Sequence, residues 1–557
     1  MTKRERLLGA KGWRGRGLDA LVGGLAVLGL APFHIWPLFL LCFGWLALRW
    51  ARAAAEPSHA AKLCRSRGFW FGFGYFLFGL FWIGSAFIAR GPSFIPLMIP
   101  AVLLLCSALS FFWALAGHFY AKLKPQGLWT AAVFASLLSA AEITRGHIFS
   151  GFPWNLPGYV FKAGTAPSQL ASVIGIYGLS FLVCLLAGYL AHYLAPYLGS
   201  TNEEQGGAAK APTARLSVSA RRAGLIFLGG LLALYGFGVL RLSLAAPIEF
   251  HPDVNLRIVQ TPFAQKDNLN PNGSVEIANA YLATTASAGL ENVTHVIWPE
   301  GSVNGLALEN EPLLRAASDL FLSFDNSPPH WLISTLREDR RAGPNSQAIS
   351  HYYNSSAAIE FSPDGSAAIS AINDKLKLVP FGEGLPYADI VEKLGVSPMS
   401  TAASFVTPAP AKELANFPDL PKLSPQICYE IIFTGMTPRK ADAAQWILNQ
   451  SNDGWYGQST GPRQHANQAA YRAIEEGLPI VRSAGNGISG VIDPYGRWHS
   501  RAEPKDNIAL DTRLPKRIKT PVYSPKIIWL LILINIAICL LYSYRRSKQR
   551  GAVIDYI

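Results

Sequence analysis

Long hydrophobic runs fill the first 245 residues, and one more lies near the end of the chain. Each run is close to the roughly 20 residues that an α-helix needs to cross the apolar core of a bilayer. A cleaved signal peptide is not favoured, because no small-residue cleavage site separates the first run from the second. The pattern predicts eight transmembrane helices, at about 18–30, 36–48, 69–89, 95–120, 127–144, 168–197, 223–245 and 526–544.

Lys and Arg residues gather on one side of these predicted spans. An even number of spans places both termini on the same side of the membrane. The leader, loops and tail on that side hold 21 Lys and Arg residues, whereas the short loops on the opposite side hold 3. Because positively charged loops stay in the cytoplasm, we expect both termini there. The segment between the last two spans then lies outside the cytoplasm. The net charge of +13 reflects this clustering at span ends, so a nucleic-acid partner is not expected.

From about residue 254 the pattern changes to short apolar runs separated by turns. Alternating strands and helices predict a layered α/β domain. The expected domain boundaries are 1–245 for seven helices, 246–515 for the α/β domain, and 516–557 for the last helix and a cytoplasmic tail. The clearest strands are 256–260, 293–298, 330–335 and 445–449, and the clearest helices are 275–290 and 466–476.

Three polar residues in this domain suggest chemistry. Cys428 is the only one of six cysteines in the segment, so an internal disulfide is not available there. Glu300 directly follows an apolar strand, and Lys375 precedes an apolar Leu-Val-Pro-Phe run, with Lys377 as its competitor. A thiol becomes a strong nucleophile when a carboxylate takes its proton and a cation stabilises the developing charge. Taken alone, Glu300 is typical of a turn residue, Lys375 of a solvated lysine and Cys428 of a buried structural thiol. Together the three residues predict cysteine-based acyl chemistry.

Several short sequence motifs that contain Gly, Pro or aromatic residues include these three residues or lie elsewhere in the chain. They are Ser150-Gly-Phe-Pro-Trp154, Trp298-Pro-Glu-Gly301, Lys375-x-x-Leu-Val-Pro-Phe-Gly-Glu383, Ile427-Cys-Tyr-Glu430, Ser451-Asn-Asp-Gly-Trp455-Tyr-Gly457, Gly461-Pro-Arg-Gln-His465 and Arg482-Ser-Ala-Gly-Asn-Gly487. The ordered Glu, Lys and Cys resemble the nitrilase, or carbon–nitrogen hydrolase, superfamily, whose fold is an αββα sandwich. With the eight predicted spans, the whole chain is similar to the bacterial apolipoprotein N-acyltransferases.

The resemblance assigns roles to residues of this chain. It implies that Glu300 is the general base, Lys375 stabilises the oxyanion, and Cys428 is the nucleophile. Glu383 resembles the second acidic residue that supports the lysine. The residues in supporting positions are Tyr429, Glu430, Asn354 and Arg482, and for the last two a turn residue and a structural salt bridge are equally suitable interpretations.

Aromatic and basic residues near the predicted membrane surface are candidates for lipid contact. Arg145 and Trp154 lie in one outer loop, where an interfacial Trp belt with a snorkelling Arg is the alternative. The family often has a Trp soon after the Gln of its first strand-loop, but here Gln265-Lys-Asp-Asn-Leu269 has none. Trp455, Trp154 and other aromatic residues are candidates to replace it.

The resemblance implies transfer of a fatty acyl chain from a membrane phospholipid, through a Cys thioester, to the α-amino group of a diacylglyceryl-cysteine lipoprotein. Such a two-step exchange predicts ping-pong kinetics. A periplasmic catalytic domain on a monomer in the bacterial inner membrane is expected, without metal or cofactor, since no Cys/His ligand spacing or P-loop occurs. A membrane-tethered amidase using the same thioester and a non-catalytic lipid-binding scaffold are the alternatives.

Overall fold

The computed structural model describes residues 7–198, 217–263, 265–324, 327–342, 348–384, 406–438, 443–518 and 523–554. The described residues form two compact units. The helical unit contains those within Met1–Phe81, Leu97–Ser243 and Tyr523–Ile557. The α/β unit contains those within Trp82–Pro96 and Leu244–Val522. Residues 82–96 therefore belong with the α/β unit, although they include the end of the span predicted at 69–89 and the start of the span predicted at 95–120.

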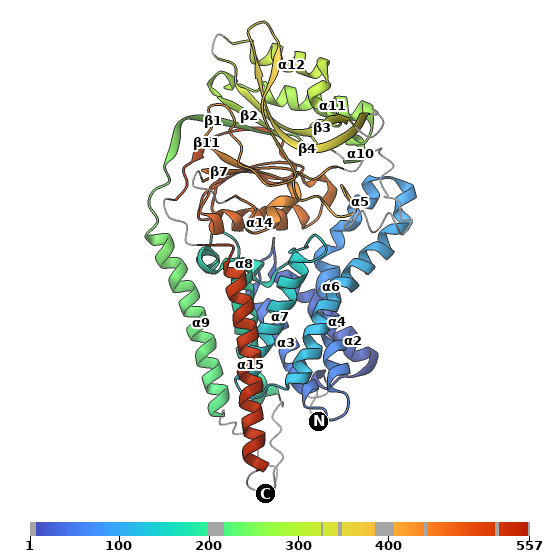
Figure 1. Cartoon of the computed structure of the whole chain (residues 1–557), viewed down its shortest axis with the longest axis vertical. Coiled ribbons are helices and arrows are strands. Elements are labelled where there is room, and N and C mark those ends of the chain that lie inside the picture. The colour runs from blue at the N-terminus through green and yellow to red at the C-terminus, as the bar shows by residue number, and fades with distance from the viewer. Residues whose placement is uncertain are drawn as a thin grey trace. The chain divides into compact units, whose positions relative to one another are not determined.

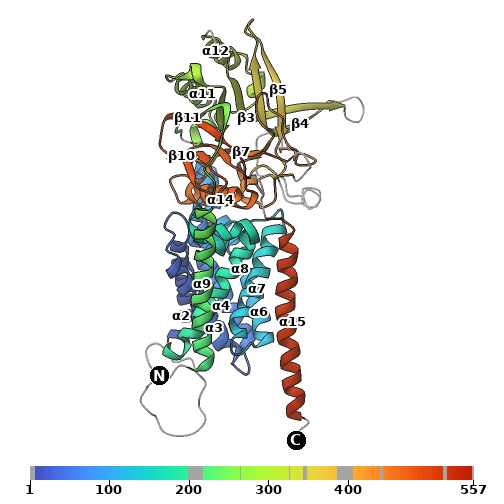
Figure 2. The same ribbon diagram turned by 90° about the vertical axis from the view of Figure 1, so that its left-hand side faces the viewer.

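The helical unit consists of long helices packed side by side. In both ribbon views α15 runs along α7 and α9 runs along α8 (Figures 1 and 2). The helix bounds are α2 Gly12–Ala26, α3 Trp36–Ala54, α4 Ala60–Leu80, α6 Ile95–Leu123, α7 Trp129–His147, α8 Ala171–Leu194, α9 Val218–Ser243 and α15 Ile527–Ile554.

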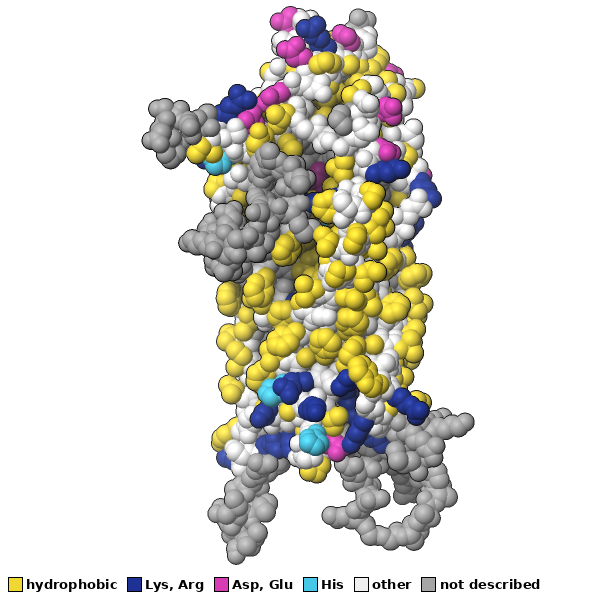
Figure 3. All heavy atoms as spheres, turned by 90° about the vertical axis from the view of Figure 1, so that its right-hand side faces the viewer, with side chains coloured by type: hydrophobic (Ala, Val, Ile, Leu, Met, Phe, Trp, Pro, Cys, Tyr) yellow, Lys and Arg dark blue, Asp and Glu magenta, His cyan; other side chains and the backbone are white. Residues whose placement is uncertain are grey.

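Among the described residues, five helical segments are long and apolar enough to cross a membrane, judged by length and composition. They are Ala60–Ala89, Pro92–Leu123, Ala166–Leu198, Val218–Ser243 and Ile527–Lys548. Helices α2, α3 and α7 also form, but α2 has only 15 residues and the other two carry buried charges. The predicted count of eight spans is therefore not confirmed. Figure 3 shows a broad hydrophobic surface over the helices, as a membrane protein requires.

Buried ion pairs explain how α3 and α7 hold charges inside the helical unit. Arg49 of α3 donates to both oxygens of Asp19 on α2, at 2.9 and 2.8 Å. Arg145 of α7 donates to Glu142 one turn earlier at 2.8 Å, and Glu142 also accepts from the Trp113 indole at 2.7 Å. A buried charge is tolerated when it is paired and hydrogen-bonded, so these helices pack against protein through their polar positions.

Two β-sheets form the centre of the α/β unit. The six-stranded sheet has the order β11-β1-β2-β3-β4-β5, and the five-stranded sheet has the order β10-β9-β8-β7-β6. Strands β1, β2 and β3 are parallel to one another, as are β6, β7 and β8. The bounds are β1 Phe250–Gln260, β2 His295–Glu300, β3 His330–Ala342, β4 Ala348–Phe361, β5 Ala367–Asp374, β6 Leu423–Ile427, β7 Trp446–Asn452, β8 Ile480–Gly485, β9 Ser489–Ile492, β10 Trp498–Ala502 and β11 Ile508–Pro515.

The sheets pack face to face, and helices cover their outer faces. One core cluster joins Ile258 and Leu332 of the larger sheet to Trp446 and Leu448 of the smaller one, all at most 1% exposed. A second cluster packs the opposite face of the larger sheet against α11 (Pro271–Thr285) and α12 (Glu311–Phe321). Helix α14 (Gly461–Glu476) is buried against the smaller sheet. The layers are therefore α, β, β, α, as the sequence predicts.

Residues 82–96 contribute one short helix, α5 (Gly84–Ala89), to the α/β unit. Just before it, the Trp82 indole donates to Gln464 at 3.3 Å, and its ring lies edge-on to Tyr456 with 4.6 Å between centroids. The guanidinium of Arg90 lies over the Trp455 ring, 5.9 Å from its centroid. Aromatic and polar contacts thus fix this segment beside the start of α14.

Candidate active site

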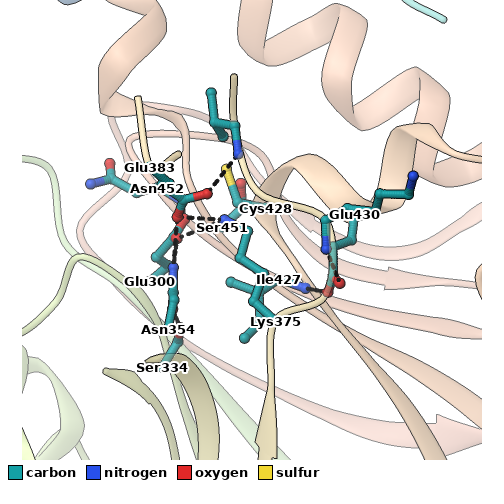
Figure 4. Close-up of polar contacts among 12 residues, drawn as sticks. Glu300, Ser334, Asn354, Lys375, Glu383, Ile427, Cys428, Glu430, Ser451 and Asn452 are labelled. Atoms are coloured by element: carbon teal, nitrogen blue, oxygen red, sulfur yellow. Dashed lines mark hydrogen bonds and ion pairs between the residues drawn. The ribbon is translucent and has the colours of Figure 1, made fainter. Parts of the chain in front are cut away.

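Strand ends bring the three predicted catalytic residues together. Glu300 ends β2 and Lys375 follows β5, both in the larger sheet, whereas Cys428 follows β6 of the smaller sheet. Side chains at the carboxyl ends of parallel strands lie at one edge of a sheet, and the two sheets face each other there. Figure 4 shows the three side chains with Glu383 in one cluster.

Lys375 is fully buried between two carboxylates. Its Nζ lies 2.8 Å from Glu383 Oε1 and 3.5 Å from Glu300 Oε1. Burial alone lowers the pKa of Lys375, but Glu383 and then Glu300 outweigh burial and hold the pKa above its usual value. The lysine is therefore a permanent cation at neutral pH, which is what a fixed oxyanion donor requires.

Asn354 holds the two carboxylates in place. Its amide Nδ2 donates to Glu300 Oε1 at 2.7 Å and to Glu383 Oε1 at 3.0 Å. The second oxygen of Glu300 accepts from the backbone N–H of Asn452 at 3.0 Å, and that of Glu383 accepts from Val379 N–H at 2.8 Å. Both carboxylates are thus oriented by donors from three separate segments of the chain. Asn354 lies within strand β4 rather than in a turn, and its side chain bridges the two carboxylates.

Cys428 begins a short 3-10 turn (Cys428–Ile432) with φ of 47°, in the left-handed region. A non-glycine residue adopts this conformation only when its surroundings impose it, and such residues cluster at active sites. The residue is 6% exposed. Burial raises the pKa of the thiol, Glu300 raises it further, and Lys375 opposes both. The sulfur therefore rests as a thiol and needs a base to become a nucleophile.

Glu430 joins the backbone around Lys375 to the backbone around Cys428. One carboxylate oxygen accepts from Leu376 N–H at 2.8 Å and Lys377 N–H at 3.2 Å. The other accepts from Ile427 N–H and from Lys412 Nζ, both at 2.8 Å. The carboxylate is fully buried. These contacts give Glu430 a positioning role.

A second buried charge cluster lies behind the nucleophile. His465 Nδ1 lies 2.9 Å from Asp453 Oδ1, and Arg482 donates to Asp453 Oδ2 at 2.7 Å. Burial raises the pKa of Asp453, but Arg482 and His465 outweigh it and lower the pKa to about 2. Ser451 donates to Asp453 Oδ1 at 2.7 Å. Arg482 is therefore part of a buried network.

Sequence reasoning assigned no role to Asp453, His465, Ser451 or Asn452. The signal was present, since all four lie in the strings 451–457 and 461–465 that carry the family resemblance. What the strings do not show is that a turn after β7 and the start of α14 meet behind Cys428.

The other predicted residues lie in varied surroundings. Tyr429 is buried, with its ring edge-on to Phe433 at 5.1 Å. Trp455 is partly exposed beside Arg90. In the helical unit, Arg145 and Trp154 are 2% and 1% exposed, and Arg145 donates to the Trp154 carbonyl at 3.0 Å. Both side chains are buried within the protein, and their contact with lipid stays a prediction.

Comparison with known protein families shows which class of protein the two units resemble. Residues 275–510 match the carbon–nitrogen hydrolase family, which agrees with the αββα layers and the Glu, Lys and Cys at strand ends. Residues 22–189 match the apolipoprotein N-acyltransferase N-terminal domain. A solved structure, the NitN amidase from Neterenkonia sp. AN1, aligns at 14% identity over 48% of this chain and 94% of that chain with a TM-score of 0.29, too low to bear on the fold.

Curated relatives then define the particular family. The apolipoprotein N-acyltransferase of Rhodopseudomonas palustris is 34% identical over 92% of both chains. That of Bradyrhizobium diazoefficiens is 34% identical over 92% of this chain and 91% of its own. The chain belongs to the apolipoprotein N-acyltransferase family, and its apolar helices agree with a bacterial membrane protein.

Proposed function

We propose that this enzyme moves a fatty acyl chain from a membrane phospholipid, through a thioester on Cys428, to the α-amino group of a lipoprotein's diacylglyceryl-cysteine. The observation that carries the proposal is the buried Lys375 cation, held 2.8 Å from Glu383 and 3.5 Å from Glu300 beside a strained cysteine. The names of the relatives, all apolipoprotein N-acyltransferases, support the acyl acceptor.

In the first half-reaction Glu300 takes the thiol proton as the Cys428 sulfur attacks the ester carbonyl of the phospholipid. The oxyanion that forms is stabilised by the Lys375 ammonium and by the N–H of Tyr429, the residue after the nucleophile. The C–O bond then breaks, and protonated Glu300 returns the proton to the leaving oxygen of the lysophospholipid. Cys428 is left as a thioester.

In the second half-reaction the neutral α-amino group of the lipoprotein attacks the thioester carbonyl. Glu300 takes a proton from the attacking nitrogen, and the same two donors stabilise the second oxyanion. The C–S bond breaks, the sulfur recovers a proton from Glu300, and the product is an amide. Because the first product leaves before the second substrate reacts, the kinetics are ping-pong.

The basic residues of the helical unit support cytoplasmic termini in the inner membrane. Arg546 near the C-terminus donates to the Leu123 carbonyl at the end of α6, and Tyr542 donates to the Lys124 carbonyl at 2.8 Å. The basic 121–126 loop and the basic tail therefore lie at one end of the helices, where Figure 3 shows Lys and Arg gathered. By the positive-inside rule that end is cytoplasmic and the α/β unit periplasmic.

Intact-protein mass spectrometry tests the proposal. We expect purified enzyme incubated with phospholipid to gain one fatty-acyl mass on Cys428, and a diacylated lipopeptide to remove it and gain an amide-linked chain. The Cys428→Ala variant should gain no mass and release no lysophospholipid, while Cys539→Ala, which changes a cysteine of helix α15, should behave as wild type. Acyl transfer by Cys428→Ala would contradict the mechanism. Loss of the adduct to water with lipopeptide present would indicate a hydrolase.

A further inference from the structure

One peptide unit carries two functions at the nucleophile. The peptide between Cys428 and Tyr429 presents the Tyr429 N–H as an oxyanion donor in the proposed function, on which this inference rests. At the other end of the same unit, the Cys428 carbonyl oxygen lies 3.2 Å from His465 Nε2. A peptide unit is planar, so a group that fixes the carbonyl direction also fixes the N–H direction. A carbonyl oxygen only accepts, so Nε2 donates in this contact.

The His465 ring is held rigidly enough to impose that direction. It is fully buried in the first turns of α14. Burial lowers the pKa of His465, so the ring is neutral and its one N–H lies on Nε2. Its Nδ1 accepts from Arg482 Nη2 at 3.2 Å and lies 2.9 Å from Asp453 Oδ1. Arg482 is itself anchored by the Ile488 carbonyl at 3.0 Å. A chain of buried contacts therefore runs from β8 to the backbone of the nucleophile.

The backbone of Cys428 needs such a contact. Its φ of 47° is unfavourable for a residue with a side chain and persists only when neighbouring groups impose it. Glu430 fixes the peptide before Cys428 through Ile427 N–H, at 2.8 Å. His465 contacts the peptide after it through the Cys428 carbonyl, at 3.2 Å. A hydrogen bond to the carbonyl oxygen also polarises the unit and strengthens its N–H as a donor.

We propose that His465 is a positioning residue, which acts through the Cys428 carbonyl to aim the Tyr429 N–H at the oxyanion in both half-reactions. Asp453 and Arg482 hold the ring in place. The role differs from that of the catalytic histidine of a Cys–His pair, because the ring contacts the backbone of the nucleophile and takes no proton from its sulfur.

Two conservative variants separate this role from a structural one. In His465→Gln the side-chain amide nitrogen occupies a position close to Nε2 and donates to the Cys428 carbonyl. In His465→Asn the amide nitrogen occupies a position close to Nδ1, so the contact with Asp453 remains and the carbonyl loses its donor. The matched control is His499→Asn, the same change at an exposed residue of edge strand β10.

The measurement is single-turnover formation of the acyl adduct on Cys428 in the full-length enzyme, with kcat and KM for lysophospholipid release and a thermal-unfolding check. Removing an oxyanion donor outright costs about 10²–10³ in kcat, so misaiming one should lower kcat of His465→Asn by about 10- to 100-fold with KM unchanged. His465→Gln should recover most of that loss, and His499→Asn should match wild type.

Equal rates for the Asn and Gln variants, whether both high or both low, would overturn the inference. If His465→Asn does not fold, Asp453→Asn takes its place: a fall in kcat at constant KM supports the role, and an unchanged kcat overturns it. The proposed function is judged separately, because it fails only if wild-type enzyme forms no adduct on Cys428.

Discussion

Replacing Glu430 by Gln tests how strongly one carboxylate holds the lysine and cysteine segments together. The carboxylate has four donors, two at each oxygen: the N–H groups of Leu376 and Lys377, and Ile427 N–H with Lys412 Nζ. A glutamine amide has one oxygen and one NH₂. In either orientation of the amide, its NH₂ group therefore faces two of these four donors, and those two donors have no acceptor.

The cheaper orientation keeps the amide oxygen on the Lys412 side, because an unpartnered buried charge costs more than an unpartnered amide. Leu376 and Lys377 then lose their acceptor. Each unsatisfied buried donor costs about 1–3 kcal/mol, so the local free energy of opening should fall by about 2–6 kcal/mol. A fall of 2 kcal/mol raises the opening equilibrium roughly 30-fold.

Hydrogen–deuterium exchange reports this local opening. We expect amide exchange in peptides covering 374–378 and 423–431 to accelerate at least about 30-fold in Glu430→Gln, with slower acyl transfer because Lys375 is no longer held. Peptides of β9 should be unchanged. Glu276→Gln, at an exposed position of α11, is the control. Exchange within about threefold of wild type corresponds to a difference under about 1 kcal/mol. That result would refute the conclusion that Glu430 holds the lysine and cysteine segments together.

Two further predictions concern Lys375 and Cys428. Glu383→Gln should lower kcat about 10- to 100-fold, since a hydrogen bond to a charged group contributes about 1.5–3 kcal/mol, and lysophospholipid release measures it; an unchanged kcat would show that Glu300 alone suffices. The pKa of Cys428 is raised by burial and Glu300, so at pH 7.5 iodoacetamide should alkylate it more slowly than free cysteine, and the rate should rise only at pH above the ordinary thiol pKa near 8.5. Alkylation faster than free cysteine would indicate a standing thiolate.

The composition of the site follows from the sequence because Glu300, Lys375 and Cys428 each directly follow or precede an apolar run. Only a few positions lie at the strand ends of two facing sheets. Residues at those positions therefore lie close together. The supporting contacts do not follow in the same way. Asp453 and His465 meet only because a turn after β7 and helix α14 both approach Cys428, a relation that local patterns do not encode.

In the membrane part, the sequence predicts where helices form but not what surrounds each helix. Hydrophobic runs locate the helices, but they do not separate a helix that faces lipid from one that faces protein. Helix α7 was predicted to be a span, yet its Glu142 and Arg145 pair with each other inside the unit. Residues 82–96 include the end of one predicted span and the start of the next, and they belong instead to the α/β unit, where Trp82 donates to Gln464. Both outcomes depend on partners distant in sequence, which are Trp113 for Glu142 and Gln464 for Trp82.

The raised pKa of Cys428 indicates how the site controls its reactivity. Two carboxylates and one ammonium give the cluster a net charge near −1 while the thiol stays neutral. A thiolate formed alone would add a second negative charge to a buried site, which burial and Glu300 oppose. Transfer of the proton to Glu300 leaves the total charge unchanged and places the thiolate beside Lys375. In the proposed mechanism the nucleophile therefore forms together with neutral Glu300, the acid that the leaving oxygen needs next. We expect Glu383 to keep Lys375 charged while Glu300 is protonated.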